Sequence, residues 1–78
     1  MNTTTRDNGY SLRGDITNQF SGVTLEIVSP AGVVVGYTKR TDAGQFRVDF
    51  VGRERVCYFS STVMVLDAMP SAARVLGF

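Results

Sequence analysis

Short runs of alternating apolar and polar residues fill the middle of the chain. Residues 45–51 alternate most clearly, so apolar side chains fall on one face of an extended strand and polar side chains on the other. Residues 23–28 alternate in the same way, while residues 33–38 and 55–59 are rich in the β-branched and aromatic side chains that favour strands. The pattern therefore predicts four strands between residues 23 and 59.

Three short segments that contain glycine separate these strands. Residues 29–32, 41–44 and 52–54 each hold a glycine, which can adopt the left-handed conformation that closes a tight turn. Connections this short join neighbouring strands that run in opposite directions. The sequence therefore predicts an antiparallel meander.

The start of the chain follows a different pattern. Residues 1–9 are polar and rich in threonine and asparagine, which is typical of a flexible N-terminal tail. Tyr10 and Leu12 then mark a first short strand that extends toward Ile16. A chain of 78 residues has room for one domain, which we place over residues 10–78.

The last twenty residues combine helical spacing with a proline. Pro70 would interrupt a continuous helix but is tolerated in a first turn, so we expect an extended or single-turn segment and then a short helix. The predicted fold class is α+β, an antiparallel meander of four to five strands with a short C-terminal helix packed on one face. The alternative is a small all-β barrel with a sixth strand over residues 62–67. The apolar positions at helical spacing are Val63, Leu66, Met69, Ala73 and Leu76.

The inventory of reactive side chains argues against catalysis. The chain has no histidine, which is the side chain that most often moves protons near neutral pH, and Cys57 is its single cysteine. One cysteine cannot form an intrachain disulfide or a zinc cluster within one chain. We therefore expect a protein that is not an enzyme and needs no cofactor or metal. An enzyme would have to assemble its site at an oligomer axis from residues such as Tyr37, Lys39, Gln45 and Tyr58.

Charge is nearly balanced over the whole chain but not along it. The net charge is +1, and five of the eight basic residues lie between residues 39 and 55. Arginine and lysine contact phosphates, and an aromatic side chain beside them can stack on a base. The candidate residues for binding nucleic acid or another partner are Lys39, Arg40, Arg47, Arg53, Arg55 and Phe59.

The face on which these residues lie depends on the register of the last hairpin. A three-residue loop would place Arg55 and Phe59 on the same face as Arg47, with Tyr58 toward the core. A two-residue loop would instead move Arg55 and Phe59 to the face of Phe50. We expect the three-residue loop, because it keeps Arg55 out of the core.

These features together predict a small binding protein of the kind that phage and plasmid genomes encode. Its first candidate partner is nucleic acid, bound through a basic β-sheet face. The alternative is a protein–protein adaptor or an inhibitor of a host protein complex. We expect a cytoplasmic protein that does not bind membranes, because residues 1–8 do not resemble a signal peptide and no apolar run is long enough to cross a bilayer. A homo-oligomer is compatible with so small a core.

Overall fold

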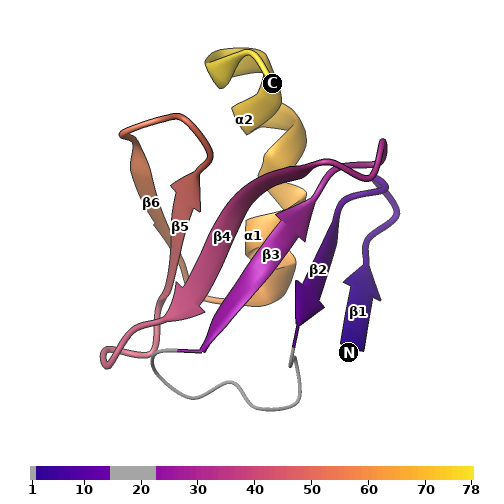
Figure 1. The fold of residues 1–78 in the computed structure, drawn as a ribbon. Coiled ribbons are helices and arrows are strands. Elements are labelled where there is room, and N and C mark those ends of the chain that lie inside the picture. Colours follow the sequence, from indigo (N-terminus) through magenta and orange to yellow (C-terminus); the bar gives the residue numbers. More distant parts are fainter. Residues whose placement is uncertain (1, 15–22) are drawn as a thin grey trace.

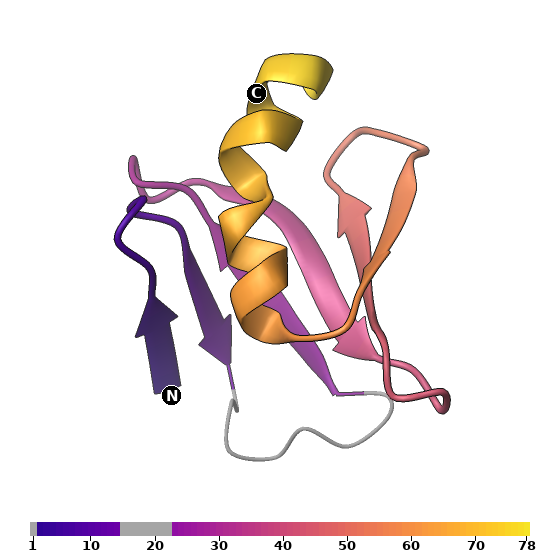
Figure 2. The ribbon, with the colours of Figure 1, turned by 180° about the vertical axis from the view of Figure 1, so that it is seen from behind.

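The protein is a six-stranded antiparallel sheet with two short helices on one of its faces. The computed structural model describes residues 2–14 and 23–78, in which the strands follow one another in chain order across the sheet. Figure 1 looks onto the open face of the sheet, and Figure 2 onto the face that the helices cover. The elements are β1 (Asn2–Thr5), β2 (Ser11–Gly14), β3 (Thr24–Val28), β4 (Val34–Arg40), β5 (Phe46–Phe50), β6 (Val56–Phe59), α1 (Thr62–Asp67) and α2 (Met69–Leu76).

The predicted α+β meander with a helical C-terminus is confirmed. The alternative, a small barrel with a strand over residues 62–67, is wrong, because the sheet does not close and these residues form α1. Helix formation prevails there because Ser61 caps the segment, its Oγ accepting a hydrogen bond from the backbone N–H of Met64 at 3.2 Å. Pro70 lies in the first turn of α2, as expected, and Ile16 falls outside the described residues.

Three of the hairpin turns share one hydrogen-bonding scheme. In each, the first residue accepts a bond from a glycine three positions later and donates its own N–H to the carbonyl four positions later. The glycine has a φ between 81° and 87°, a left-handed conformation that turns the chain back into the next strand. The three turns begin at Arg6, Ser29 and Thr41, and their glycines are Gly9, Gly32 and Gly44.

The N-terminal segment differs from the flexible tail predicted for residues 1–9. Residues 2–5 form β1, which pairs with β2 along its whole length. Strand β1 has no apolar pattern that would reveal it in the sequence, because it is an edge strand made of asparagine and threonine. Its place is determined by the turn at Arg6–Gly9, which has the same scheme as the central hairpins, and by threonine's preference for extended backbone.

A hydrogen bond from the N-terminal hairpin stabilises the break between the two helices. Pro70 has no N–H, so the carbonyl of Leu66, four residues earlier, lacks its usual helical donor. The Nδ2 of Asn8 donates to this carbonyl at 2.9 Å, while the Oδ1 of Asn8 accepts from the N–H of Tyr10 at 3.0 Å. An ion pair between Arg6 Nε and Asp67 Oδ1, at 3.0 Å, lies beside it. The β1–β2 turn is thus attached to the helical segment by polar contacts.

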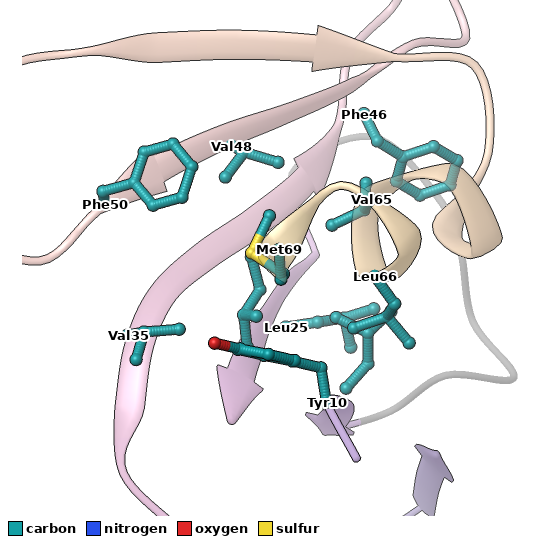
Figure 3. Packing of buried hydrophobic residues seen from close by; sticks show 11 residues of the cluster. Tyr10, Leu25, Val35, Phe46, Val48, Phe50, Val65, Leu66 and Met69 are labelled. Atoms are coloured by element: carbon teal, nitrogen blue, oxygen red, sulfur yellow. The ribbon is translucent and has the colours of Figure 1, made fainter. Parts of the chain in front are cut away.

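The core lies between the helices and the middle of the sheet. Figure 3 shows Met69 pointing from the helix toward Val48, with Leu66 close to Leu25 and Val65 close to Phe46. The residues of β5 that alternation assigned to one face are all buried, which confirms that prediction. The buried cluster comprises Tyr10, Leu12, Leu25, Ile27, Val35, Phe46, Val48, Phe50, Val65, Leu66 and Met69.

The contact between Asn8 and Leu66 gives a test by double-mutant cycle. Asn8→Ala should lower the free energy of unfolding by about 1–2 kcal/mol, because it removes the side-chain donor from a carbonyl that already lacks its usual helical donor. Pro70→Ala supplies a backbone N–H to the same carbonyl, so Asn8→Ala should cost about 1 kcal/mol less in that background. Urea unfolding of the four proteins measures the coupling. Equal costs in both backgrounds would show that Asn8 does not compensate for Pro70.

Thr38 provides a second test, of the core itself. This residue is 1% exposed, lies between Leu25 and Val48 in the sheet register, and its Oγ1 has no hydrogen-bond partner among the described residues. Thr38→Val should therefore raise the free energy of unfolding by about 1 kcal/mol. Thr24→Val, on an exposed position of β3, controls for the strand preference of valine. A loss of stability relative to that control would mean that the hydroxyl makes a favourable contact.

Candidate functional site

The register of the last hairpin decides which side chains share the open face. Arg47 pairs with Tyr58 and Phe46 pairs with Phe59, so the expectation of a three-residue loop is wrong. The turn is closed by a bond from the N–H of Arg53 to the carbonyl of Phe50 at 3.1 Å, with a left-handed Gly52. Phe59 consequently lies on the helix side, half-buried against the core, and Tyr58 lies beside Arg47 on the open face.

The cost of burying the charge of Arg55 is the reason to expect the other register. That cost does not arise, because Arg55 precedes an edge strand and is exposed. The helices lie over the middle of the sheet (Figure 2), and at this corner Arg55 and Val56 are exposed. A charged residue is therefore tolerated on the helix side at this position.

Two rows of side chains cross the open face, and we call these nine residues the open-face set. Strand pairing defines each row, because residues directly opposite one another on neighbouring strands point to the same side. The first row runs from β2 to β6 and the second from β3 to β6. The first is Arg13, Glu26, Tyr37, Asp49 and Val56, and the second is Thr24, Lys39, Arg47 and Tyr58.

Two ion pairs neutralise most of the charge in the open-face set. Arg13 Nε contacts Glu26 Oε1 at 2.7 Å, and Arg47 Nη2 contacts Asp49 Oδ1 at 3.1 Å. The hydrogen bond that Arg13 donates to Glu26, together with the negative charge of Glu26, raises the pKa of Arg13 above the ordinary arginine value. Lys39 makes no ion pair within the described part of the chain, so three cations and two carboxylates leave the face with a net charge of +1.

Two exposed aromatic rings accompany these charges. The side chain of Tyr37 is 42% exposed and that of Tyr58 is 54% exposed. The tyrosines lie two strands and two residues apart, which corresponds to about 12 Å between their Cα atoms for regular strand geometry. Lys39 and Arg47 are next to them in the same register. Partly hydrophobic rings and cationic groups therefore lie side by side on a surface that neither α1 nor α2 covers.

The structure separates the six candidate residues from one another. Only Lys39 and Arg47 lie on the open face. Arg40 pairs with Phe46 and so belongs to the opposite side of the sheet, as do Arg55 and Phe59. Arg53 binds the end of α2, where its Nε and Nη2 donate to the carbonyl of Leu76 at 3.1 and 2.6 Å. The positive charge of Arg53 interacts favourably with the negative end of the helix dipole at this C-terminus. Arg53 therefore has a structural role.

Sequence reasoning missed three members of the open-face set that could bind a partner. Tyr37 has the same strand parity as Lys39, so alternation along β4 could have assigned it to this face. Arg13 and Tyr58 could be placed only with the register of their hairpins in hand.

Neither a cluster of metal-ligating side chains nor a membrane-spanning helix is present among the described residues. Among residues 2–14 and 23–78, no three side chains of the histidine, cysteine, aspartate or glutamate type gather where a metal ion could be held. Neither helix in these ranges has the length and apolar character needed to span a bilayer. Comparison of the chain with protein-family models, with curated proteins and with solved structures found no match.

The role of Arg53 can be separated from that of Lys39 by substitution. Arg53→Ala should lower the free energy of unfolding by about 0.5–1 kcal/mol, since α2 loses a charged donor at its C-terminus. Arg53→Lys should recover only part of this loss, because an ammonium group cannot reproduce the two-donor geometry of the guanidinium. Lys39→Ala, which removes an exposed side chain, should leave stability nearly unchanged. Equal stability of Arg53→Ala and the parent protein in urea unfolding would contradict the capping role.

Proposed function

We propose that this protein binds single-stranded nucleic acid on the open face of its sheet. The observation that carries the proposal is the pair of exposed tyrosines, Tyr37 and Tyr58, set beside Lys39 and Arg47 on the uncovered side of the sheet. Open sheet faces that bind single strands combine aromatic platforms with cationic side chains. Each tyrosine would stack on one base, which requires bases that are not paired in a duplex.

The two cations would supply the phosphate contacts. Lys39 is exposed and makes no ion pair with another described residue, so its ammonium group can donate to a phosphate oxygen without first breaking an ion pair. Arg47 would exchange its contact with Asp49 for a phosphate oxygen, and its Nε atom is a buried donor that has no hydrogen-bond partner in residues 2–14 and 23–78. An additional acceptor would therefore satisfy a group that is unsatisfied in the free protein.

The small number of available cations sets the strength of binding. With two phosphate contacts, the logarithm of the binding constant should fall with the logarithm of salt concentration with a slope of about −1.4. Affinity should be micromolar or weaker near physiological salt and should favour single strands over duplexes. Arg13 is a third cation on this face, held in an ion pair with Glu26, and a longer single-stranded nucleic acid could reach it.

One observation favours a protein as the alternative partner. Four of the five charges on the open face are already paired with one another, and tyrosine and arginine are among the residues enriched at the energetic centre of protein interfaces. Such a surface needs no net charge to bind a protein. Salt dependence distinguishes the two functions, because phosphate binding releases counterions and tyrosine-centred protein docking responds weakly to salt.

Fluorescence anisotropy with labelled oligothymidine and oligouridine tests the proposal. Tyr58→Ala should weaken binding by about 5- to 150-fold, since one stacked base contributes about 1–3 kcal/mol. Asp49→Asn should strengthen it by about 2- to 5-fold, because Arg47 is released from an ion pair worth about 0.5–1 kcal/mol.

Two matched variants serve as controls for that experiment. Val63→Ala removes a comparably exposed apolar side chain from α1, and Glu54→Gln removes a carboxylate that lies off the open face. Both should bind oligonucleotide within about twofold of the parent protein. Absence of binding at about 20 mM salt, or binding that is independent of salt, would reject the proposed function.

A further inference from the structure

The two edges of the sheet differ in their protection against pairing. Strand β1, at one edge, consists of an asparagine and three threonines, whereas β6, at the other, consists of valine, cysteine, tyrosine and phenylalanine. Natural edge strands usually carry a charge, a proline or a bulge that prevents another strand from adding to them. Residues 56–59 carry none of these, and no hydrogen bond between described residues covers the outer side of β6.

An apolar groove runs beside this edge on the helix side. It has a volume of about 240 Å³ and lies between the β5–β6 hairpin and α2. Cys57, which belongs to β6, forms part of its wall, so the groove and the edge are continuous. Apart from Arg55 and Ser71, its lining consists of Phe50, Cys57, Ala72, Val75 and Leu76.

The charge at the groove indicates what would occupy it. Arg55 is its single charged lining residue, is exposed, and forms no ion pair with any described residue. Val75, on the opposite wall, is 71% exposed, which is unusual for a large apolar side chain on a helix. The groove therefore combines uncovered apolar surface with an unneutralised positive charge, which is complementary to an apolar segment that carries a carboxylate.

We propose that β6 binds an extended peptide of a protein partner, which adds to the sheet as a seventh strand. The backbone of the peptide would pair with the outer N–H and C=O groups of β6. Alternate side chains of an added strand point to the helix side, so one apolar side chain enters the groove and an acidic side chain two residues away contacts Arg55. The proposed ligand class is thus an extended segment with alternating apolar residues and one glutamate or aspartate. This proposal does not depend on nucleic-acid binding at the open face.

Charge complementarity selects such a peptide over a second copy of this chain. If two copies paired through β6, the strand brought to the groove would again be residues 56–59, which contain no carboxylate. Self-association would therefore leave the cation without a partner.

Fluorescence polarisation with three labelled nonapeptides tests this inference. The peptides alternate valine and threonine and differ in one position, which holds glutamate, glutamine or lysine. The glutamate peptide should bind the parent protein about 3- to 10-fold more tightly than the lysine peptide, because an exposed attraction to Arg55 is replaced by an exposed repulsion of similar size. Arg55→Glu should reverse this order. Amide resonances of residues 56–59 should shift when the glutamate peptide is added.

Two aspartate substitutions separate the groove from the rest of the surface. Val75→Asp places a carboxylate in the groove and should weaken binding of the glutamate peptide by at least about tenfold. Val63→Asp, on α1 outside the groove, should leave this binding unchanged. Circular dichroism verifies that each variant is folded before binding is measured.

Three results would overturn the proposal. Equal binding of the glutamate and lysine peptides would show that Arg55 does not select the ligand. Absence of binding to all three peptides would show that β6 does not bind an added strand. Light scattering is the third measurement. A concentration-dependent dimer that Val56→Lys abolishes would assign the β6 edge to a second copy of this chain.

Discussion

Burial of one face of the sheet by Val65, Leu66 and Met69 is the interaction on which the other features depend. A meander of six strands has a single apolar face, and two helices of six and eight residues are all that is available to cover it among the described residues. Because side chains alternate along a strand, fixing this face also fixes the opposite one. The helices are short, however, and leave the corner beside β6 uncovered. Both surfaces with a proposed function arise from this limited coverage.

The parts of the fold that the sequence could predict are those in which burial of one face requires apolar residues at a regular spacing along the chain. Phe46, Val48 and Phe50 show this for the strands, and the helical spacing of Leu66, Met69 and Leu76 shows it for the C-terminal segment. Val63 was predicted on the same helical face but is 44% exposed, and Val65 is buried instead. Strand β1 could not be predicted in this way, because backbone pairing and a glycine turn hold it rather than apolar side chains. The predicted register between β5 and β6 was wrong for a related reason. Both loop lengths satisfy the turn residues, and the extent of helix coverage near Arg55 is a property of the whole fold.

The candidate site shows the same division between local pattern and tertiary structure. A cluster of cations within residues 39–55 is visible in the sequence, but its members lie on different faces of the sheet because side chains alternate along each strand. Lys39 and Arg47 remain available on the open face, while Arg53 binds a backbone carbonyl of α2 that no composition could identify. Counting positive residues therefore overestimates the basic character of any one surface. The pairing of Arg47 with Asp49 lowers it further and makes the exposed tyrosines the more distinctive feature.

The bond between Asn8 and the Leu66 carbonyl spans 58 positions of the sequence. A ribosome adds the acceptor long after the donor, so the first hairpin must wait for the helical segment before this contact can form. Formation of the N-terminal edge is thereby linked to the completion of the C-terminal layer. Contacts of such long range slow folding but make it an all-or-none process, because neither end gains its full stability alone. In this chain Asn8 and the neighbouring Arg6–Asp67 ion pair make the two ends of the polypeptide thermodynamically interdependent.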